Sequence, residues 1–300
     1  MDIAAIMRKV CCLGAGITRI IYDDITLYLI SYSKYNHVLL IPDEPSDKIV
    51  DDTMFPLFKD KFELSNKREL PNISGKLKVF GGKSLHRTTG LFSKLNLDEI
   101  DISCLDTRNV KDMSTMFLET GRKNKTATKI VGSENLNTSN VEHMDCMFCN
   151  ASLDGMSFLA FDTRSLNSAH SMFYSFHTND SIDLSNFNIS KLKVADQMFY
   201  SCEAPSINLS SFNRQIDTMD RIFCLCKTNR LDISNLKYPF KVTKRLEMFE
   251  GFDSYTSFPT IILDKSETLV YFEALISNRG IIIDKNNGSI EYIRGIKPDK

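Results

Sequence analysis

The chain has 300 residues, of which 42% are hydrophobic and 25% charged, a composition that is typical of folded proteins and excludes a disordered chain. Its 37 basic and 38 acidic side chains leave a net charge of −1. We therefore predict neither nucleic-acid binding nor attraction to an anionic membrane, because both require a clustered positive excess. The length favours two or three domains, or one elongated array.

The first 70 residues lack the repeat found further along the chain, and we predict that they form an N-terminal cap or a small accessory domain. Apolar runs at 25–31 and 37–42 predict two strands. Polar residues interrupt the stretch 25–41, so no membrane span is predicted. Arg19 breaks the apolar run after Lys9, and no secretory signal is expected. These features favour an intracellular or virion-associated protein.

A pair of residues that ends in phenylalanine recurs through the middle of the chain. The successive phenylalanines lie 25, 31, 25, 26, 24, 26 and 23 residues apart, and the longest interval contains a polar insertion at 121–125. The pairs are Leu91-Phe92, Met116-Phe117, Met147-Phe148, Met172-Phe173, Met198-Phe199, Ile222-Phe223, Met248-Phe249 and Tyr271-Phe272. This period predicts about eight repeat units over residues 71–277.

Each unit is predicted to begin with a strand. Alternating apolar and polar residues form four tetrads at matching places, 100–103, 182–185, 207–210 and 231–234. Such alternation is typical of half-buried strands. Because one unit of this size does not bury its own apolar face, neighbouring units are expected to stack, with their strands in a single parallel sheet.

The second half of each unit has the spacing of a short helix. Val110, Met113, Met116 and Phe117 lie at i, i+3, i+6 and i+7, and four later units repeat this spacing. Residues three or four apart share one face of a helix. We therefore predict an α/β repeat solenoid, with one or two helical turns per unit and a buried ladder of phenylalanines from Phe117 to Phe249.

The units at 100–117 and 182–199 resemble those of the BspA-like leucine-rich-repeat family, whose repeat is approximately L-D-L-S-N-F-D-T-S-x-V-x-x-M-x-x-M-F. The resemblance covers about two-thirds of the chain, and several copies match at many positions of the motif. It implies a non-enzymatic leucine-rich-repeat-like solenoid, of the kind found in bacterial surface adhesins and lipoproteins, in protists and in large DNA viruses. A cell-surface location is thus a further expectation from the resemblance.

Residues 278–300 are predicted to form a C-terminal capping hairpin and tail. Apolar runs at 281–283 and 289–293 flank the segment Asn286-Asn287-Gly288. Asn-Gly favours the tight turn of a hairpin. An antiparallel pair of strands would close the exposed end of the array.

The eight cysteines are predicted to remain reduced thiols. Cys146 and Cys149 flank an apolar pair, and Cys202 and Cys226 each follow a unit's phenylalanine by three residues, so these four are interpreted as packing residues. A zinc site needs four ligands, and a second Cys-x-x-Cys motif is missing. No metal is therefore predicted.

No motif predicts catalysis or a cofactor. Gly81-Gly82-Lys83-Ser84 resembles a phosphate-binding loop, but that loop needs a glycine five residues before Gly82, where this chain has Leu77. No histidine can be paired with a nucleophile from the sequence. An enzyme is therefore the least favoured class of protein.

The best supported function is a rigid scaffold that binds a protein or another macromolecule through its sheet. Short polar side chains on the outward strand positions offer hydrogen bonds at low entropic cost. These positions are Asp101, Ser103, Asp183, Ser185, Asn208, Ser210, Asp232 and Ser234. Two alternatives stay open: a structural component of a larger assembly, such as a virion or a surface lattice, and an effector delivered into a host cell. The sequence does not define the oligomeric state.

Overall fold

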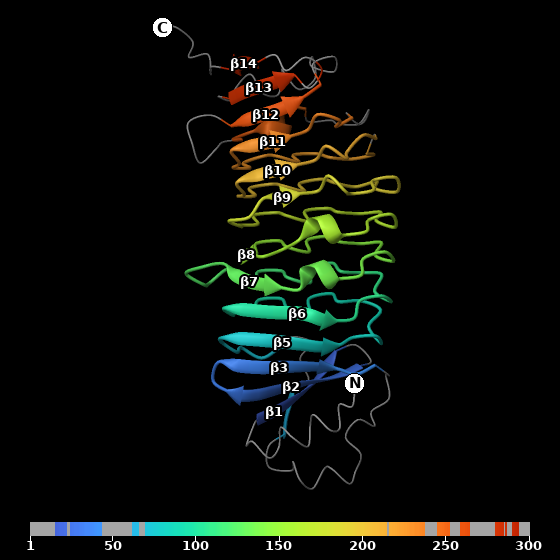
Figure 1. Cartoon of the computed structure of the whole chain (residues 1–300), viewed down its shortest axis with the longest axis vertical. Helices are drawn as coiled ribbons and strands as arrows, with labels where there is room; N and C mark the ends of the chain where they lie inside the picture. Colours follow the sequence, from blue (N-terminus) through green and yellow to red (C-terminus); the bar gives the residue numbers. More distant parts are fainter. Residues whose placement is uncertain are drawn as a thin grey trace.

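The computed structural model describes residues 16–22, 25–43, 62–65, 70–214, 216–237, 245–252, 259–264, 280–284, 286 and 290–293. These residues contain fourteen strands and short 3-10 helices. Figure 1 shows the strands lying one above another along the long axis of the molecule. From β5 onward they follow each other in chain order. The predicted pair Tyr271-Phe272 lies outside the described residues.

Four strands form the N-terminal end of the stack. β1 (Gly16–Tyr22) pairs antiparallel with β2 (Ile25–Ser33), and β2 pairs antiparallel with β3 (Asn36–Ile41). β4 (Phe62–Ser65) lies parallel to β1 on its other side. The apolar core continues without a break from these strands into the units that follow them. The first of those units begins at β5, which pairs with β3 in parallel.

One strand from each successive unit extends the stack, and neighbouring strands pair in parallel where they are hydrogen-bonded. The predicted parallel pairing is thereby confirmed. In order, they are β5 (Lys76–Gly81), β6 (Glu99–Leu105), β7 (Thr128–Val131), β8 (Leu153–Asp154), β9 (Ile182–Asp183), β10 (Ser206–Asn208), β11 (Arg230–Asp232), β12 (Thr260–Leu263) and β13 (Gly280–Asp284). At the far end, β14 (Ile290–Ile293) pairs antiparallel with β13.

The strand ladder is interrupted between β8 and β9, so the described strands form two sheets, of eight and six strands. The prediction of a single sheet was wrong in this respect. Aspartate side chains take the place of the ladder at the interruption. Asp154 accepts hydrogen bonds from the backbone and side-chain amides of Asn179, both at 2.8 Å, and Asp180 accepts one from the Gly155 N–H at 2.6 Å. These carboxylates satisfy amides that a neighbouring strand would otherwise pair.

The segments predicted as helices are series of tight turns, and the described residues contain no α-helix. The Met116 N–H donates to the Met113 carbonyl at 3.2 Å, which closes a turn of four residues. The next amide, of Phe117, instead donates to Met147 of the following unit at 2.9 Å. Backbone hydrogen bonds therefore alternate between closing turns and joining neighbouring units. The 3-10 helices are η2 (Ser133–Asn135), η3 (Phe158–Ala160) and η4 (Arg245–Phe249).

Positive φ angles explain why the turns replace a helix. In five consecutive units, the residue that precedes the apolar pair has a φ of about 55°, outside the right-handed helical region. This residue is Thr115, Cys146, Ser171, Gln197 or Arg221 in successive units. Turns closed between residues i and i+3 bring every third side chain to the same face, so the predicted spacing of buried residues was correct although the predicted α/β class was not. The fold is rich in strands and poor in helix.

The core contains the predicted ladder of phenylalanines. Seven rings, from Phe92 to Phe249, are fully buried and stack in sequence, with neighbouring centroids 5.1–5.7 Å apart. The methionines of the same segments are also buried. The ladder from Phe117 to Phe249 is therefore confirmed. No helix in the described part of the chain is long and apolar enough to cross a membrane.

Candidate functional site

The predicted outward row divides between the two sheets. Strand register places Asp183, Asn208 and Asp232 directly side by side. Asp101 lies in the other sheet, opposite Lys78 on one side and Val131 on the other. The structure thus groups three of the four predicted positions, and β7 and β8 separate Asp101 from them.

The serines of the row follow the same division. Ser185 and Ser210 lie two residues beyond Asp183 and Asn208 and are partly exposed, and Ser103 has the same relation to Asp101. Ser234, at the equivalent place after β11, is buried, with an exposed fraction of 9%. The prediction that Ser234 is available for contact is therefore wrong, because its side chain is almost entirely removed from solvent.

Each acidic or amide side chain of the row is hydrogen-bonded to the backbone of its own unit. The first carboxylate or amide oxygen accepts the backbone N–H two residues later at 3.0 Å, in an Asx turn. In Asp101 this oxygen also accepts the Ser103 hydroxyl at 2.5 Å. The four acidic and amide side chains of the row are partly exposed, and their orientation is consequently fixed before any ligand binds.

In the eight-stranded sheet, charged side chains of β5, β6 and β7 form a row of ion pairs beside Asp101. Glu99 lies between Lys76 and Lys129, with N–O distances of 3.5 and 3.8 Å, and Lys78 lies 2.9 Å from Asp101. The hydrogen bond to Asp101 raises the pKa of Lys78. Beside these residues is a small hollow of about 270 Å³, whose lining also includes Tyr32 and His37.

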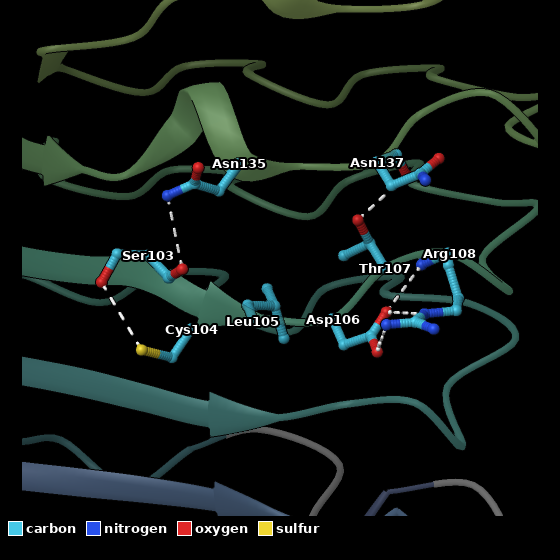
Figure 2. Close-up of a pocket in the computed structure, with 8 residues that line it drawn as sticks. All are labelled: Ser103, Cys104, Leu105, Asp106, Thr107, Arg108, Asn135 and Asn137. Atoms are coloured by element: carbon cyan, nitrogen blue, oxygen red, sulfur yellow. Dashed lines mark hydrogen bonds and ion pairs between the residues drawn. The ribbon is translucent and has the colours of Figure 1, made fainter.

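A larger hollow of about 460 Å³ lies at the carboxyl end of β6 (Figure 2). β7 pairs with only the first half of β6, and beyond Val131 the chain turns away at Gly132 into η2. The Ser103 amide is therefore satisfied by Asp101, and its carbonyl accepts Asn135 Nδ2 at 3.4 Å. The hollow occupies the place where a longer β7 would have continued the sheet.

The lining of this hollow is polar and already partly paired. The Asp106 carboxylate accepts the Arg108 guanidinium at 2.9 Å, and Thr107 donates to the Asn137 carbonyl at 2.9 Å (Figure 2). Cys104 is exposed at the rim. Among the described residues, no cluster of three or more histidine, cysteine or acidic side chains could hold a metal ion. The hollow can supply hydrogen-bond donors and acceptors to a polar ligand.

Sequence reasoning missed most of this lining. Arg108, Asn135 and Asn137 were not among the predicted contact residues, because the hollow requires two units to face each other across a shortened strand. One signal was present in the sequence: Asp-Thr-Arg occurs at 106–108 and again at 162–164. In both copies the aspartate binds the arginine two residues later.

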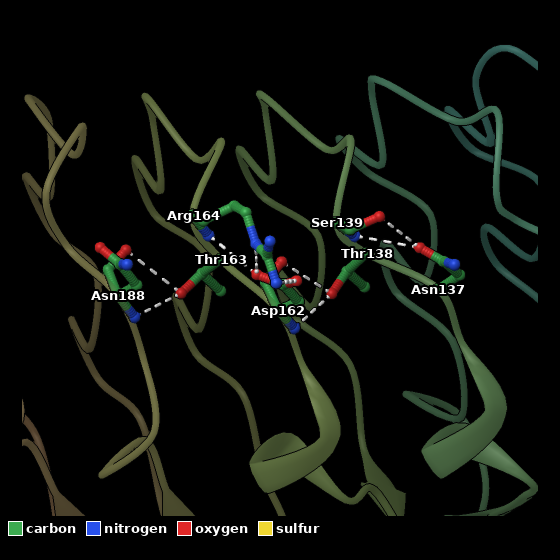
Figure 3. Close-up of polar contacts among 7 residues, drawn as sticks. All are labelled: Asn137, Thr138, Ser139, Asp162, Thr163, Arg164 and Asn188. Atoms are coloured by element: carbon green, nitrogen blue, oxygen red, sulfur yellow. Dashed lines mark hydrogen bonds and ion pairs between the residues drawn. The ribbon is translucent and has the colours of Figure 1, made fainter.

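Buried threonines connect neighbouring units at the corners that follow η2 and η3 (Figure 3). Thr138 Oγ1 donates to the Asp162 carbonyl at 3.0 Å and accepts the Asp162 N–H at 2.7 Å. Thr163 makes the same two contacts with Asn188, at 3.3 and 2.7 Å. Each hydroxyl therefore satisfies a backbone donor and a backbone acceptor of the next unit, and these contacts hold the corners of neighbouring units together.

Ion pairs between units predict a stability that depends on pH. The hydrogen bond from Lys227, 2.9 Å from Glu203, lowers the pKa of Glu203 below its ordinary value, and His177 lies on the other side of that carboxylate. A carboxylate whose pKa is lowered in the folded chain stabilises the fold above its unfolded pKa, and this contribution is lost as the pH falls through the folded pKa. The pair is largely exposed, so its effect should be small and should weaken with added salt.

We therefore expect Glu203→Gln to melt at a lower temperature than the wild type near neutral pH and at the same temperature once the pH is below the folded pKa. Thermal unfolding over a series of pH values measures this difference. Glu134→Gln, which removes an exposed carboxylate on η2, is the matched control and should show no such change. A difference between Glu203→Gln and the wild type that stays constant across the series would contradict the assignment.

The sequence matches the family described as "Mycoplasma protein of unknown function, DUF285", over residues 63–173 and again over residues 121–236. The two matches together span more than half of the chain, and the chain belongs to this family. No curated protein and no solved structure matches it.

Proposed function

We propose that this chain is a non-enzymatic repeat scaffold, a leucine-rich-repeat-like solenoid, that binds a macromolecular partner through its sheet. The resemblance of the units to BspA-like repeats supports this class of fold, as does the stack of parallel strands joined by similar turns. Adhesion and protein–protein interaction are the functions that such a surface serves best.

One observation carries the proposal. Asp183, Asn208 and Asp232 are partly exposed, aligned by strand register, and fixed by Asx turns. Binding normally costs conformational entropy when side chains become ordered, and side chains that are already fixed avoid part of that cost. An aligned row of such groups suits an extended partner better than a small molecule, which would need an enclosing pocket.

The test places bulk and charge on the row without disturbing the Asx turns. In Ser185→Arg/Ser210→Arg, both changed side chains are partly exposed and lie in the turns directly after β9 and β10, and the backbone amides that close the Asx turns remain. The control, Ser190→Arg/Asn213→Arg, adds the same charge at exposed positions away from the strands. The wild type and both variants are immobilised, and macromolecules retained from the native source are quantified by mass spectrometry.

We expect the wild type and the control to retain the same species, and the sheet variant to retain about tenfold less of it. Equal retention by all three proteins, or loss in the control alone, would contradict the proposal. Sedimentation of the purified chain provides a second readout. A recognition module should sediment as a monomer, whereas a component of a lattice or a virion should self-associate.

A further inference from the structure

Cys146 and Cys149 form a pair of thiols on the surface of one turn. The Cys149 N–H donates to the Cys146 carbonyl at 3.1 Å, so the two residues are the first and last of a hydrogen-bonded turn. The Cα atoms of such a turn lie within about 7 Å of each other, and disulfides join Cα atoms about 4.4–6.8 Å apart. Met147 and Phe148, between the cysteines, are fully buried and anchor the turn in the core.

The two side chains are accessible and belong to the same four-residue turn. Both are half-buried, whereas Cys202, Cys224 and Cys226 are buried. The Cys149 thiol is a hydrogen-bond partner of the Cys146 sulfur, and Asn150 Nδ2 donates to Cys149 Sγ at 3.3 Å. The pair therefore meets the two requirements of a reactive dithiol, which are proximity and solvent access.

This pair is specific to one unit. The equivalent positions, identified by the backbone hydrogen bonds between units, hold Thr115 with Leu118, Ser171 with Tyr174, Gln197 with Tyr200, and Arg221 with Cys224. The turn itself does not require cysteine at either position, since these other residues adopt it. Packing alone, which the sequence suggested, does not account for two cysteines at the outward positions of one turn.

We propose that Cys146 and Cys149 are a thiol–disulfide exchange site that reacts with small-molecule disulfides and closes into a reversible intramolecular disulfide. The Cys146 thiolate attacks one sulfur of the small disulfide, whose S–S bond breaks, and one thiol is released. Cys149 then attacks the mixed disulfide at the Cys146 sulfur and releases the second thiol. The protein loses two protons and two electrons, and the small disulfide takes up both and is reduced to two thiols.

The two cysteines have different roles in this reaction. The hydrogen bond from the Cys149 thiol lowers the pKa of Cys146 to about 7, although nearby Asp145 opposes the change. The same hydrogen bond raises the pKa of Cys149. Cys146 is accordingly the attacking thiolate, and Cys149 closes the ring. Burial raises the pKa of Cys202 and Cys226, which are therefore protected internal controls.

The experiment uses the full reduced chain and oxidised glutathione. After incubation over a range of glutathione ratios, free thiols are blocked and peptides are mapped by mass spectrometry. We expect one disulfide, between Cys146 and Cys149, that a dithiol reductant reverses, with Cys202, Cys224 and Cys226 still reduced. Failure to form this disulfide at the most oxidising ratio overturns the proposal.

Two single variants test the assigned order. Cys149→Ser should accumulate glutathione on Cys146, because the second step is blocked. Cys146→Ser should acquire glutathione on Cys149 about tenfold more slowly than Cys149→Ser acquires it on Cys146. Faster modification of Cys149 than of Cys146 overturns the order of attack. Unchanged melting of both variants in the reduced state confirms that the fold is intact, and the wild-type disulfide map tests the site even if a variant unfolds.

Discussion

Phe199→Ala is expected to lower the free energy of unfolding by about 3–5 kcal/mol, as is usual for truncating a buried aromatic side chain. The Phe199 ring is fully buried between Phe173 and Phe223, with centroid distances of 5.1 and 5.7 Å and nearly parallel planes. Truncation removes both stacking contacts and leaves a cavity that the turns on either side are too well fixed to fill. Equilibrium unfolding in denaturant measures the loss.

The neighbouring residue provides a matched control. Tyr200 is also stacked on an aromatic ring, that of Tyr174, at 4.8 Å, but its side chain lies on the outer surface and is partly exposed. Tyr200→Ala should cost no more than about 1 kcal/mol. Because each unit supports its neighbours, amide hydrogen exchange in Phe199→Ala should also accelerate in the units of Phe173 and Phe223. Equal losses in the two variants would show that the ladder does not carry the stability assigned to it.

Gly132→Ala is the second substitution with a large expected effect, about 3 kcal/mol of destabilisation. Gly132 has a φ of 82°, and a Cβ atom there would lie 2.3 Å from the Cα atom of Ser103, on β6. The methyl group would push η2 away from β6 and distort the larger hollow. Both backbone strain and steric overlap contribute to the loss.

Gly90→Ala separates these two causes. Gly90 also has a positive φ, 70°, but a Cβ atom there would meet nothing closer than 3.9 Å. This control should cost only about 1 kcal/mol, from the left-handed backbone alone. Thermal and denaturant unfolding of both variants measure the difference. A Gly132→Ala protein as stable as Gly90→Ala would mean that η2 can move away from β6 without cost.

The sequence predicted the features that repeat and missed the features that occur once. The period, the parallel strands and the phenylalanine ladder follow from apolar residues that return at fixed intervals, because burial selects them in every unit. The prediction of helices was wrong because a spacing of three residues between buried side chains fits both a helix and a series of turns. The positive φ values that separate the two lie at Thr115, Cys146 and Gln197, which are not glycines and give no warning in the sequence.

The candidate site shows the same difference between features that repeat and features that occur once. The alignment of Asp183, Asn208 and Asp232 follows from the repeat, and the strand register agrees with it. The displacement of Asp101 and the polar hollow beside it depend on a four-residue β7 and on the turn at Gly132. Both features are irregularities of single units. Their geometry depends on how one unit packs on the next, which the repeat pattern does not specify.

The hydrogen bonds that join the turns of neighbouring units run from backbone to backbone, as from Phe117 to Met147 and from Phe173 to Met198. These particular bonds involve no side chain, and outward residues as different as threonine, glutamine and arginine occupy the same place in successive units. Mutation can therefore change the chemistry of that surface one residue at a time at little cost to the architecture. Because each unit contacts only its neighbours, the gain or loss of one whole unit would likewise leave the contacts within the other units unchanged.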